Sequence, residues 1–311
     1  MKRITAILLT GLLLLSTIGC IRVSCNGLSF SAPIRYANAD KYTAGNFTYD
    51  ETKVKKVEIE WISGSVTLSN GSGTLSVSES GADTLSAEKQ LHWWIDGTTL
   101  KIKFCKSGEN LSLTELEDKK LTVELPASAD LKLDIASGTV LAKDALKLGE
   151  CSINSASGGM DFASVSAEEI GIECASGSVG FGTVSAAGSI EIESASGELD
   201  IGDVTAEEIS VKNASGSIRI DSATANELKI ESASGGIDIG LKYVADTEID
   251  VASGNIRLNV LDKEAGAVFY LDHYHVFSSS VTIDMKNKPW TLGRGEQKVT
   301  IDAASGNIKI D

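Results

Sequence analysis

The chain has 311 residues, and 42% of them are hydrophobic, which excludes wholesale disorder. Its formal charge of -15 argues against nucleic acid or an anionic membrane surface as the main partner. The 30 glycines, 3 prolines and 5% aromatic residues predict many tight turns around a core of small aliphatic side chains.

The N-terminal segment, 1–20, predicts an export signal. Two basic residues precede an almost unbroken apolar stretch from Ile4 to Ile18, which is shorter than the roughly 20 residues that span a bilayer. Cys20 follows this stretch and resembles the lipidated cysteine of a bacterial lipobox. A cleaved, secreted form and an uncleaved anchor are the alternatives. Each of the three places the folded part outside the cytoplasm, on the outer face of the cell membrane or beyond it.

Polar residues 21–50 are predicted to form a tether. Residues 51–130 alternate between apolar and polar side chains, which predicts an N-terminal β region that leads into a set of repeats. Within this region, Gly64 marks a candidate degenerate repeat. Five cysteines do not make a disulfide scaffold in a chain of this length, and the sequence assigns no partner to Cys25 or Cys105.

A tripeptide, Ala-Ser-Gly, returns at regular intervals through residues 131–260. Successive copies recur with a nearly constant period of about 19 residues, which is the signature of a solenoid whose repeats stack on one another. One more copy follows within residues 261–311 after an interruption. The glycines of the tripeptide are Gly138, Gly158, Gly177, Gly197, Gly216, Gly235, Gly254 and Gly306.

Four positions of the repeat are apolar in nearly every copy. They lie seven and five residues before the glycine, and two and four residues after it. Among all the copies, Thr247 is the one exception at these positions. The spacing of two within each pair predicts short strands with one buried face, and the many β-branched side chains favour the same structure.

The spacing between inward positions predicts the shape of each repeat. Strict alternation breaks at three places per repeat, so the chain must turn there. We therefore predict an all-β fold, a single-stranded parallel β-helix (β-solenoid) with about 19 residues per rung and three sides. A right-handed coil is favoured because parallel crossovers are almost always right-handed. At the tripeptide corner, glycine can adopt a positive φ, and alanine is predicted to point inward.

Residues 261–311 are predicted to hold enlarged rungs and a C-terminal repeat. The chain finishes at Asp311, directly after a strand and without an obvious cap. Because an uncovered strand can pair with another chain, this end predicts end-to-end self-association.

The repeat motif resembles that of a known family. Ser-Ala-Ser-Gly followed by alternating apolar residues occurs at Ser194–Ile201 and Ser232–Ile239, Lys120–Pro126 precedes the array, and Ala304–Ile310 closes it. Over about residues 50–311 the chain resembles the bacterial putative adhesin family of β-strand-repeat proteins, a domain of unknown function. The resemblance implies a role in the cell envelope or in adhesion. Some relatives lie beside envelope-stress regulators, so a structural or regulatory envelope module is the alternative.

The sequence contains no HExxH, Walker, Gly-x-Ser-x-Gly or Cys-x-x-Cys motif. We therefore predict a non-enzymatic protein whose partner is a cell-envelope protein or glycan, with the N-terminal anchor as its only membrane contact. A polysaccharide-acting β-helix enzyme is a further alternative. Such enzymes need paired carboxylates and long loops, for which the regular repeats leave no room.

An outward column four residues before the glycine is mostly acidic. A calcium ion bridging its carboxylates is one interpretation, and a solvated face with no cofactor is the alternative that we expect. The candidate ligands are Glu173, Glu193, Glu231 and Asp250.

Several aromatic residues lie outside the regular array. They are candidates for stacking on sugar rings or for anchoring a protein partner, and the alternative is that they cap the ends of the solenoid. They are Trp93, Trp94, Tyr270, Tyr274 and Trp290.

Overall fold

The computed structural model describes residues 33–50, 53–71, 74–81, 85–110, 119–272, 276–283 and 288–311. The predicted export signal, Cys20, Cys25 and Tyr274 lie outside these residues. The described chain divides into an N-terminal unit (33–167 and 172–176) and a C-terminal unit (168–171 and 177–311). In the described residues the regular structure is β-strand, with only two short 3-10 helices, η2 (Ala39–Lys41) and η4 (Ala87–Lys89). The predicted all-β class is confirmed.

Parallel strands stack in the N-terminal unit. β9 (Asp130–Ile135) pairs with β11 (Glu150–Ser155), so that Leu131 lies opposite Cys151. β10 (Thr139–Lys147) pairs with β12 (Met160–Ala167), so that Val140 lies opposite Met160. Both registers are offset by one repeat. β13 (Glu169–Cys174) follows β12 along the chain.

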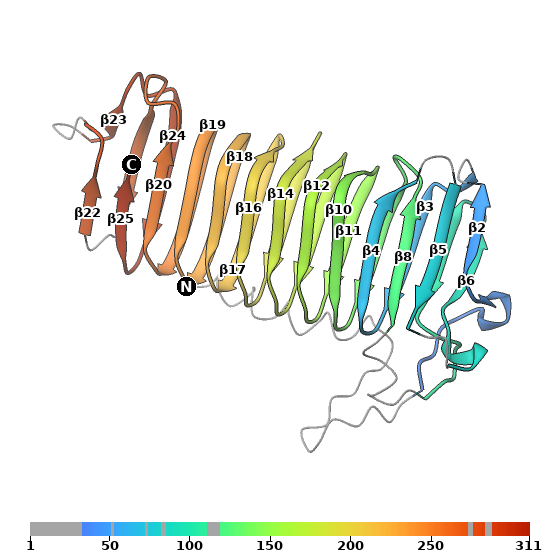
Figure 1. The fold of residues 1–311 in the computed structure, drawn as a ribbon. Coiled ribbons are helices and arrows are strands. Elements are labelled where there is room, and N and C mark those ends of the chain that lie inside the picture. The colour runs from blue at the N-terminus through green and yellow to red at the C-terminus, as the bar shows by residue number, and fades with distance from the viewer. Residues whose placement is uncertain are drawn as a thin grey trace, which may run out of the picture. The chain divides into compact units, whose positions relative to one another are not determined.

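The first repeat of this unit lies between later ones. β3 (Lys56–Trp61) pairs in parallel with β9 on one side and with β7 (Thr99–Lys103) on the other. β4 (Ser65–Asn70) likewise lies between β10 and β8 (Lys120–Leu125), as Figure 1 shows. Gly64, between β3 and β4, stacks beneath Gly138, as expected for a degenerate repeat.

Antiparallel strands flank β7 and β8. The pairs are β8 with β5, β5 with β2, β7 with β6 and β6 with β1. The segment 43–50, which the sequence analysis assigned to the tether, therefore belongs to the sheet. The bounds are β1 (Thr43–Ala44), β2 (Phe47–Asp50), β5 (Thr74–Ser80) and β6 (His92–Asp96).

The C-terminal unit contains the most regular stack. Ile192 lies opposite Val211, Val211 opposite Ile230, and Ile230 opposite Ile249, each one repeat apart. This is the internal file of aliphatic side chains that the repeat predicts. The strands are β14 (Val179–Ala186), β15 (Ser189–Ser194), β16 (Leu199–Thr205), β17 (Glu208–Ser215), β18 (Ile218–Ser234), β19 (Ile237–Ser253) and β20 (Ile256–Val260).

Every residue of the four predicted columns is buried, including Thr247. The alternation of strand side chains thus places the aliphatic residues inside. The corner differs from the prediction in one detail, because the alanine of the tripeptide is only half-buried. The fully buried residue lies one position earlier, as at Ser194, Asn213 and Ser232, because the strand keeps alternating for one more residue before it turns.

The C-terminal end departs from the predicted order. β24 (Gln297–Ala303) and β25 (Asn307–Ile310) pair in parallel with β19 and β20 on one side. On the other side they pair with β21 (Ala267–Asp272) and β22 (Val276–Ser279), and β23 (Trp290–Leu292) runs antiparallel to β21 (Figure 1). The last described strand, β25, is therefore enclosed rather than open, because β22 pairs with its outer edge. The expectation of an uncovered strand at Asp311 was wrong, because β25 is paired on both sides. End-to-end self-association itself stays a prediction.

The corner glycines are required by backbone geometry and by contact. Gly216 has a φ of +127°, in a region that side chains with a Cβ rarely adopt. A Cβ on Gly216 would also lie 2.0 Å from the carbonyl oxygen of the stacked Gly197. The repeat thus brings successive corners into backbone contact, and no larger residue fits.

Candidate functional site

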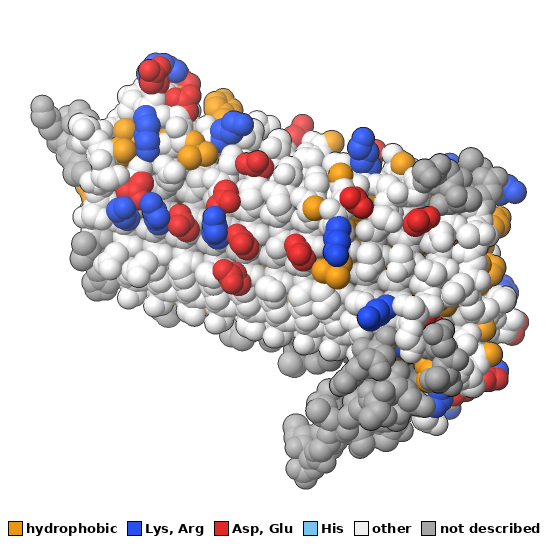
Figure 2. Space-filling model, in the orientation of Figure 1, with side chains coloured by type: hydrophobic (Ala, Val, Ile, Leu, Met, Phe, Trp, Pro, Cys, Tyr) orange, Lys and Arg blue, Asp and Glu red, His pale blue; other side chains and the backbone are white. Residues whose placement is uncertain are grey.

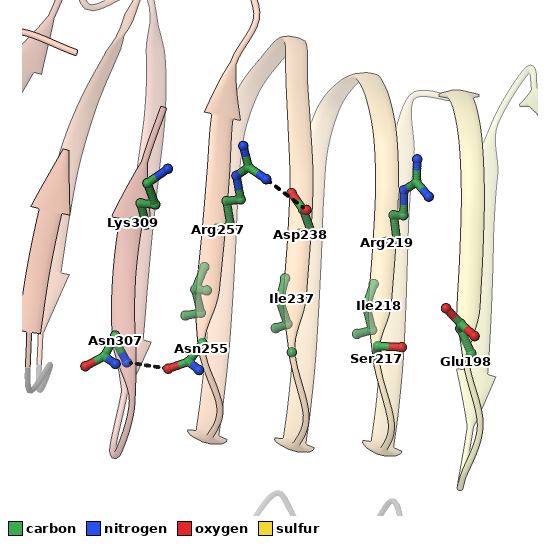
Figure 3. Close-up of a pocket in the computed structure, with 12 residues that line it drawn as sticks. Glu198, Ser217, Ile218, Arg219, Ile237, Asp238, Asn255, Arg257, Asn307 and Lys309 are labelled. Carbon is green, nitrogen blue, oxygen red and sulfur yellow. Dashed lines mark hydrogen bonds and ion pairs between the residues drawn. The ribbon is translucent and has the colours of Figure 1, made fainter. Parts of the chain in front are cut away.

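A groove of about 430 Å³ crosses the outer face of the C-terminal unit beside the glycine corners (Figure 3). It runs over the beginnings of β16, β18, β19, β20 and β25. Its floor and one rim come from the position directly after the corner glycine, and its other rim comes from the position three after it. The first row is Glu198, Ser217, Gly236, Asn255 and Asn307, and the second is Arg219, Asp238, Arg257 and Lys309.

Strand alternation produces this arrangement. Ile218, Ile237 and Ile256 lie between the two rows and point into the core, so their neighbours on either side point outward. Gly236 has no side chain, and no heavy atom lies within 4 Å of the place where its Cβ would be. The groove is therefore open at this point of its floor.

Charges of opposite sign alternate along the outer rim from Asp200 to Arg257. Asp200 lies opposite Arg219, Arg219 opposite Asp238, and Asp238 opposite Arg257, each on the next strand of the stack. The alternation ends at β25, where a second cation, Lys309, lies opposite Arg257. Figure 2 shows charged side chains of both signs across this face. Over its first four positions the rim thus presents donors and acceptors in turn.

Neighbouring carboxylates hold the rim cations in place. Arg219 donates to Asp221 at 2.9 Å, and Arg257 donates to Asp311 at 2.7 Å. Hydrogen bonds from Lys309, Ser280 and Arg257 hold the pKa of Asp311 well below its ordinary value. Both arginine side chains are 55% exposed, so their guanidinium groups are fixed in position and still open to a ligand.

Lysines neutralise part of the acidic column. Lys212 lies within 2.5 Å of Glu193 and 2.9 Å of Glu191. Burial lowers the pKa of Lys212, but its hydrogen bonds with these carboxylates outweigh burial and raise the pKa overall. Lys229 lies 3.1 Å from Glu231.

Asp250 continues the same column. Its pKa is raised, first by burial and then by the carboxylates of Glu248, Glu231 and Asp302. Glu173, the remaining candidate ligand, belongs to the N-terminal unit. Within the described residues, no group of three or more His, Cys, Asp or Glu side chains is arranged to hold a metal ion. The calcium site stays a prediction.

The candidate aromatic residues are dispersed, and none of those described lines the groove. Trp93 stacks on Phe47 with ring centroids 3.9 Å apart. Trp94 lies between the ammonium groups of Lys41 and Lys101, at 4.7 and 4.9 Å.

The C-terminal aromatic residues are also apart from the groove. Trp290 packs on Phe277 with ring centroids 4.8 Å apart, while Tyr270 is exposed on β21. The groove was missed at the sequence level, although its signal lies in the two outward columns after each glycine.

These features define a class of protein, one built from β repeats with a groove on an outer face whose rims carry charged and amide side chains. The chain belongs to the Toastrack DUF4097 family, whose model matches residues 72–311. A comparison with curated proteins finds no match. Among the residues that the structure describes, none forms a helix long and apolar enough to cross a membrane.

Solved structures resemble this chain at low sequence identity. A putative adhesin from Parabacteroides merdae is 11% identical with a TM-score of 0.50, over 90% of this chain and 100% of that one. A putative lipid binding protein from Parabacteroides distasonis is 14% identical with a TM-score of 0.46, over 86% and 97%. A putative adhesin from Bacteroides fragilis is 12% identical with a TM-score of 0.39, over 86% and 96%. Only the first likeness supports the fold, and none assigns a function.

Proposed function

We propose that this protein is a non-enzymatic, cell-surface β-solenoid that binds a component of the cell envelope through its outer faces. The observation that carries the proposal is the groove over β16 to β25, where fixed charged groups and amides surround an open floor. The shape of the groove and the rows of side chains along the stacked strands provide the binding surface there, so no inserted loop is needed. The description of the Parabacteroides merdae protein as a putative adhesin agrees with such a role.

The finer architecture forms part of the proposal. Strand registers that advance by one repeat, as from Ile190 to Ile209, support rungs of about 19 residues. The three breaks of alternation in the sequence support a three-sided coil. Right-handed winding follows from the general preference of parallel crossovers. The repeated corner glycines allow the same close backbone contact in every repeat, so the distance between successive rungs stays constant.

Attachment to the cell surface is proposed through Cys20. Lipidation there would leave residues 21–32 between the membrane and the first described residue. A form cleaved and secreted without lipid is the alternative. Mass spectrometry of the protein from membranes distinguishes the two, because a diacylglycerol on Cys20 adds a defined mass to the N-terminal peptide.

Binding to isolated envelopes tests the proposed function. The full chain is sedimented with envelope fragments over a range of concentrations, and the bound fraction is measured. We expect saturable binding that excess unlabelled protein competes away. Binding that stays linear with concentration would contradict the proposal, and so would release of soluble fragments from a panel of glycans, which would indicate an enzyme.

A further inference from the structure

This inference rests on the proposed function and specifies its ligand. We propose that the groove binds an extended, uncharged glycan whose chain lies across the strands, with its hydroxyl groups on Arg219, Asp238 and Arg257 and its rings over Gly236. Four observations on the groove lead to this ligand class: its length, its paired strands, its alternating charges and its open floor.

The groove is long. It spans five stacked strands, which at the usual strand spacing is a length of about 19 Å. A cavity of about 430 Å³ that extends over this length is elongated along the stack of strands, which suits an extended chain.

The strands beneath the groove leave nothing for a peptide backbone to pair with. β18, β19 and β20 each pair with a neighbour on both sides, so their backbone groups are already used. A peptide that adds to a sheet needs an open sheet edge, and one that docks by apolar side chains needs apolar pockets. The isoleucines beneath the groove are only 1–2% exposed and form no such pocket. The ligand therefore meets the rim side chains, both their charged or amide ends and the carbon chains that carry them.

The alternating rim selects an uncharged polymer. A chain with a negative group at every strand spacing would meet Asp238 between the two arginines, and a positive chain would meet Arg219 and Arg257 themselves. Hydroxyl groups both donate and accept, so a glycan satisfies every position of the rim. The net charge of -15 also opposes the approach of a polyanion.

Two arginines and one aspartate give the rim a repeat. Arg219 and Arg257 are two strands apart, about 9.6 Å, with Asp238 between them. On the other side of the groove, the Asn307 backbone N–H donates to Asn255 Oδ1 at 3.2 Å, which fixes the Asn255 amide beside the floor (Figure 3). Polar groups of both kinds thus face the same space.

Filling the floor is the test. Gly236→Leu places a side chain in open space at a position without a positive φ, so the fold is retained. Gly171→Leu is the matched control, because Gly171 also has nothing within 4 Å of its Cβ position and does not line the groove. The full chain in mild detergent is titrated calorimetrically with neutral hexasaccharides of β-linked glucose and of N-acetylglucosamine, and with a galacturonate hexasaccharide.

We expect a neutral hexasaccharide to bind, with at least a tenfold loss of affinity in Gly236→Leu and in the double variant Arg219→Ala with Arg257→Ala. Gly171→Leu should bind as the wild type does. The inference is overturned if neither neutral hexasaccharide binds, if galacturonate binds more tightly, or if Gly236→Leu binds like the wild type. Envelope sedimentation of the same proteins separates the two proposals. Wild-type envelope binding that Gly236→Leu leaves unchanged overturns the glycan groove alone, and its absence in the wild type overturns the proposed function.

Discussion

Thr247 is the single polar side chain in the four buried columns. It is 0% exposed, and its hydroxyl has no hydrogen-bond partner among the described residues. It lies opposite Leu228 on one strand and Val299 on the other. An unsatisfied buried hydroxyl costs free energy that a methyl group of the same shape does not.

Thr247→Val is therefore expected to raise the free energy of unfolding by about 1–3 kcal/mol. Urea denaturation followed by circular dichroism measures the change. The same substitution at the exposed Thr205 is the control and should have little effect. A loss of stability in Thr247→Val would mean that the hydroxyl has a partner, such as a buried water molecule.

Asp250 makes stability depend on pH. Its pKa in the folded protein is raised above the ordinary value of 3.8, by burial and then by nearby carboxylates. The folded state therefore holds the proton to a higher pH than the unfolded state does, and this group's contribution to stability is lost as pH rises through the folded pKa.

Asp250→Asn is accordingly expected to raise the thermal midpoint at pH 7 and to leave it unchanged at a pH well below 3.8, where the carboxyl is protonated in both states. Scanning calorimetry at the two pH values measures this difference. Asp203→Asn, at an exposed carboxylate on another strand face, is the control substitution. An equal shift at both pH values would exclude the electrostatic explanation.

The corner between two strands depends on one residue with no side chain. Gly216→Ala would bring a Cβ to 2.0 Å from the Gly197 carbonyl oxygen and would also force an unfavourable φ. Backbone strain of this kind costs about 1–3 kcal/mol before the contact is counted. We expect a clear fall in the urea midpoint. Gly236→Ala is the control, since its Cβ meets open space, and equal effects of the two substitutions would contradict this account.

The repeat was predictable because each strand position recurs. A buried column of isoleucine, leucine and valine is visible in the sequence whichever strand is considered, so the register of β17, β18 and β19 followed directly. The positions of β24 and β25 could not be predicted in this way. A constant period predicts which strands pair only while each repeat stacks on the repeat before it in the sequence. Residues 261–292 interrupt the period.

The groove was less predictable than the fold. Its outward columns change from residue to residue, as from Asp200 to Arg219, so they show no apolar period to detect. The open space at the Cβ position of Gly236 depends on the backbone conformation and on the neighbouring residues together, which the sequence alone does not give. The aromatic residues, in contrast, stood out in the sequence. Trp93 and Trp290 pack on phenylalanine rings, Trp94 lies against lysines, and Tyr270 is exposed away from the groove.

A buried ion pair holds together the strands of the N-terminal unit. Lys119 is 1% exposed and lies 2.7 Å from Glu79, which is 3% exposed. The same ammonium group donates to the carbonyl oxygens of Lys89 and Phe104 and lies 3.8 Å from the centroid of the Phe104 ring. Burial lowers the pKa of Lys119, although Glu79 opposes this effect.

Removing one member of this pair should destabilise the unit. Lys119→Met leaves a buried carboxylate without its cation, which costs about 3–5 kcal/mol. In the double variant with Glu79→Gln, the amide oxygen can still accept from the Leu91 backbone N–H, so much of the loss should be regained. Thermal unfolding of the wild type, both single variants and the double variant measures how far the two side chains depend on each other. If the stability losses of the single variants simply add in the double variant, the proposed interaction between Lys119 and Glu79 is contradicted.

The enclosed position of β25 has a consequence for synthesis. A chain synthesised from its N-terminus contains β20 and β22 before residues 307–310 are added. Until then the slot between these two strands is vacant, with unpaired backbone groups on both walls. A chain that lacks residues 307–310 therefore exposes two unpaired strand edges, which favour aggregation.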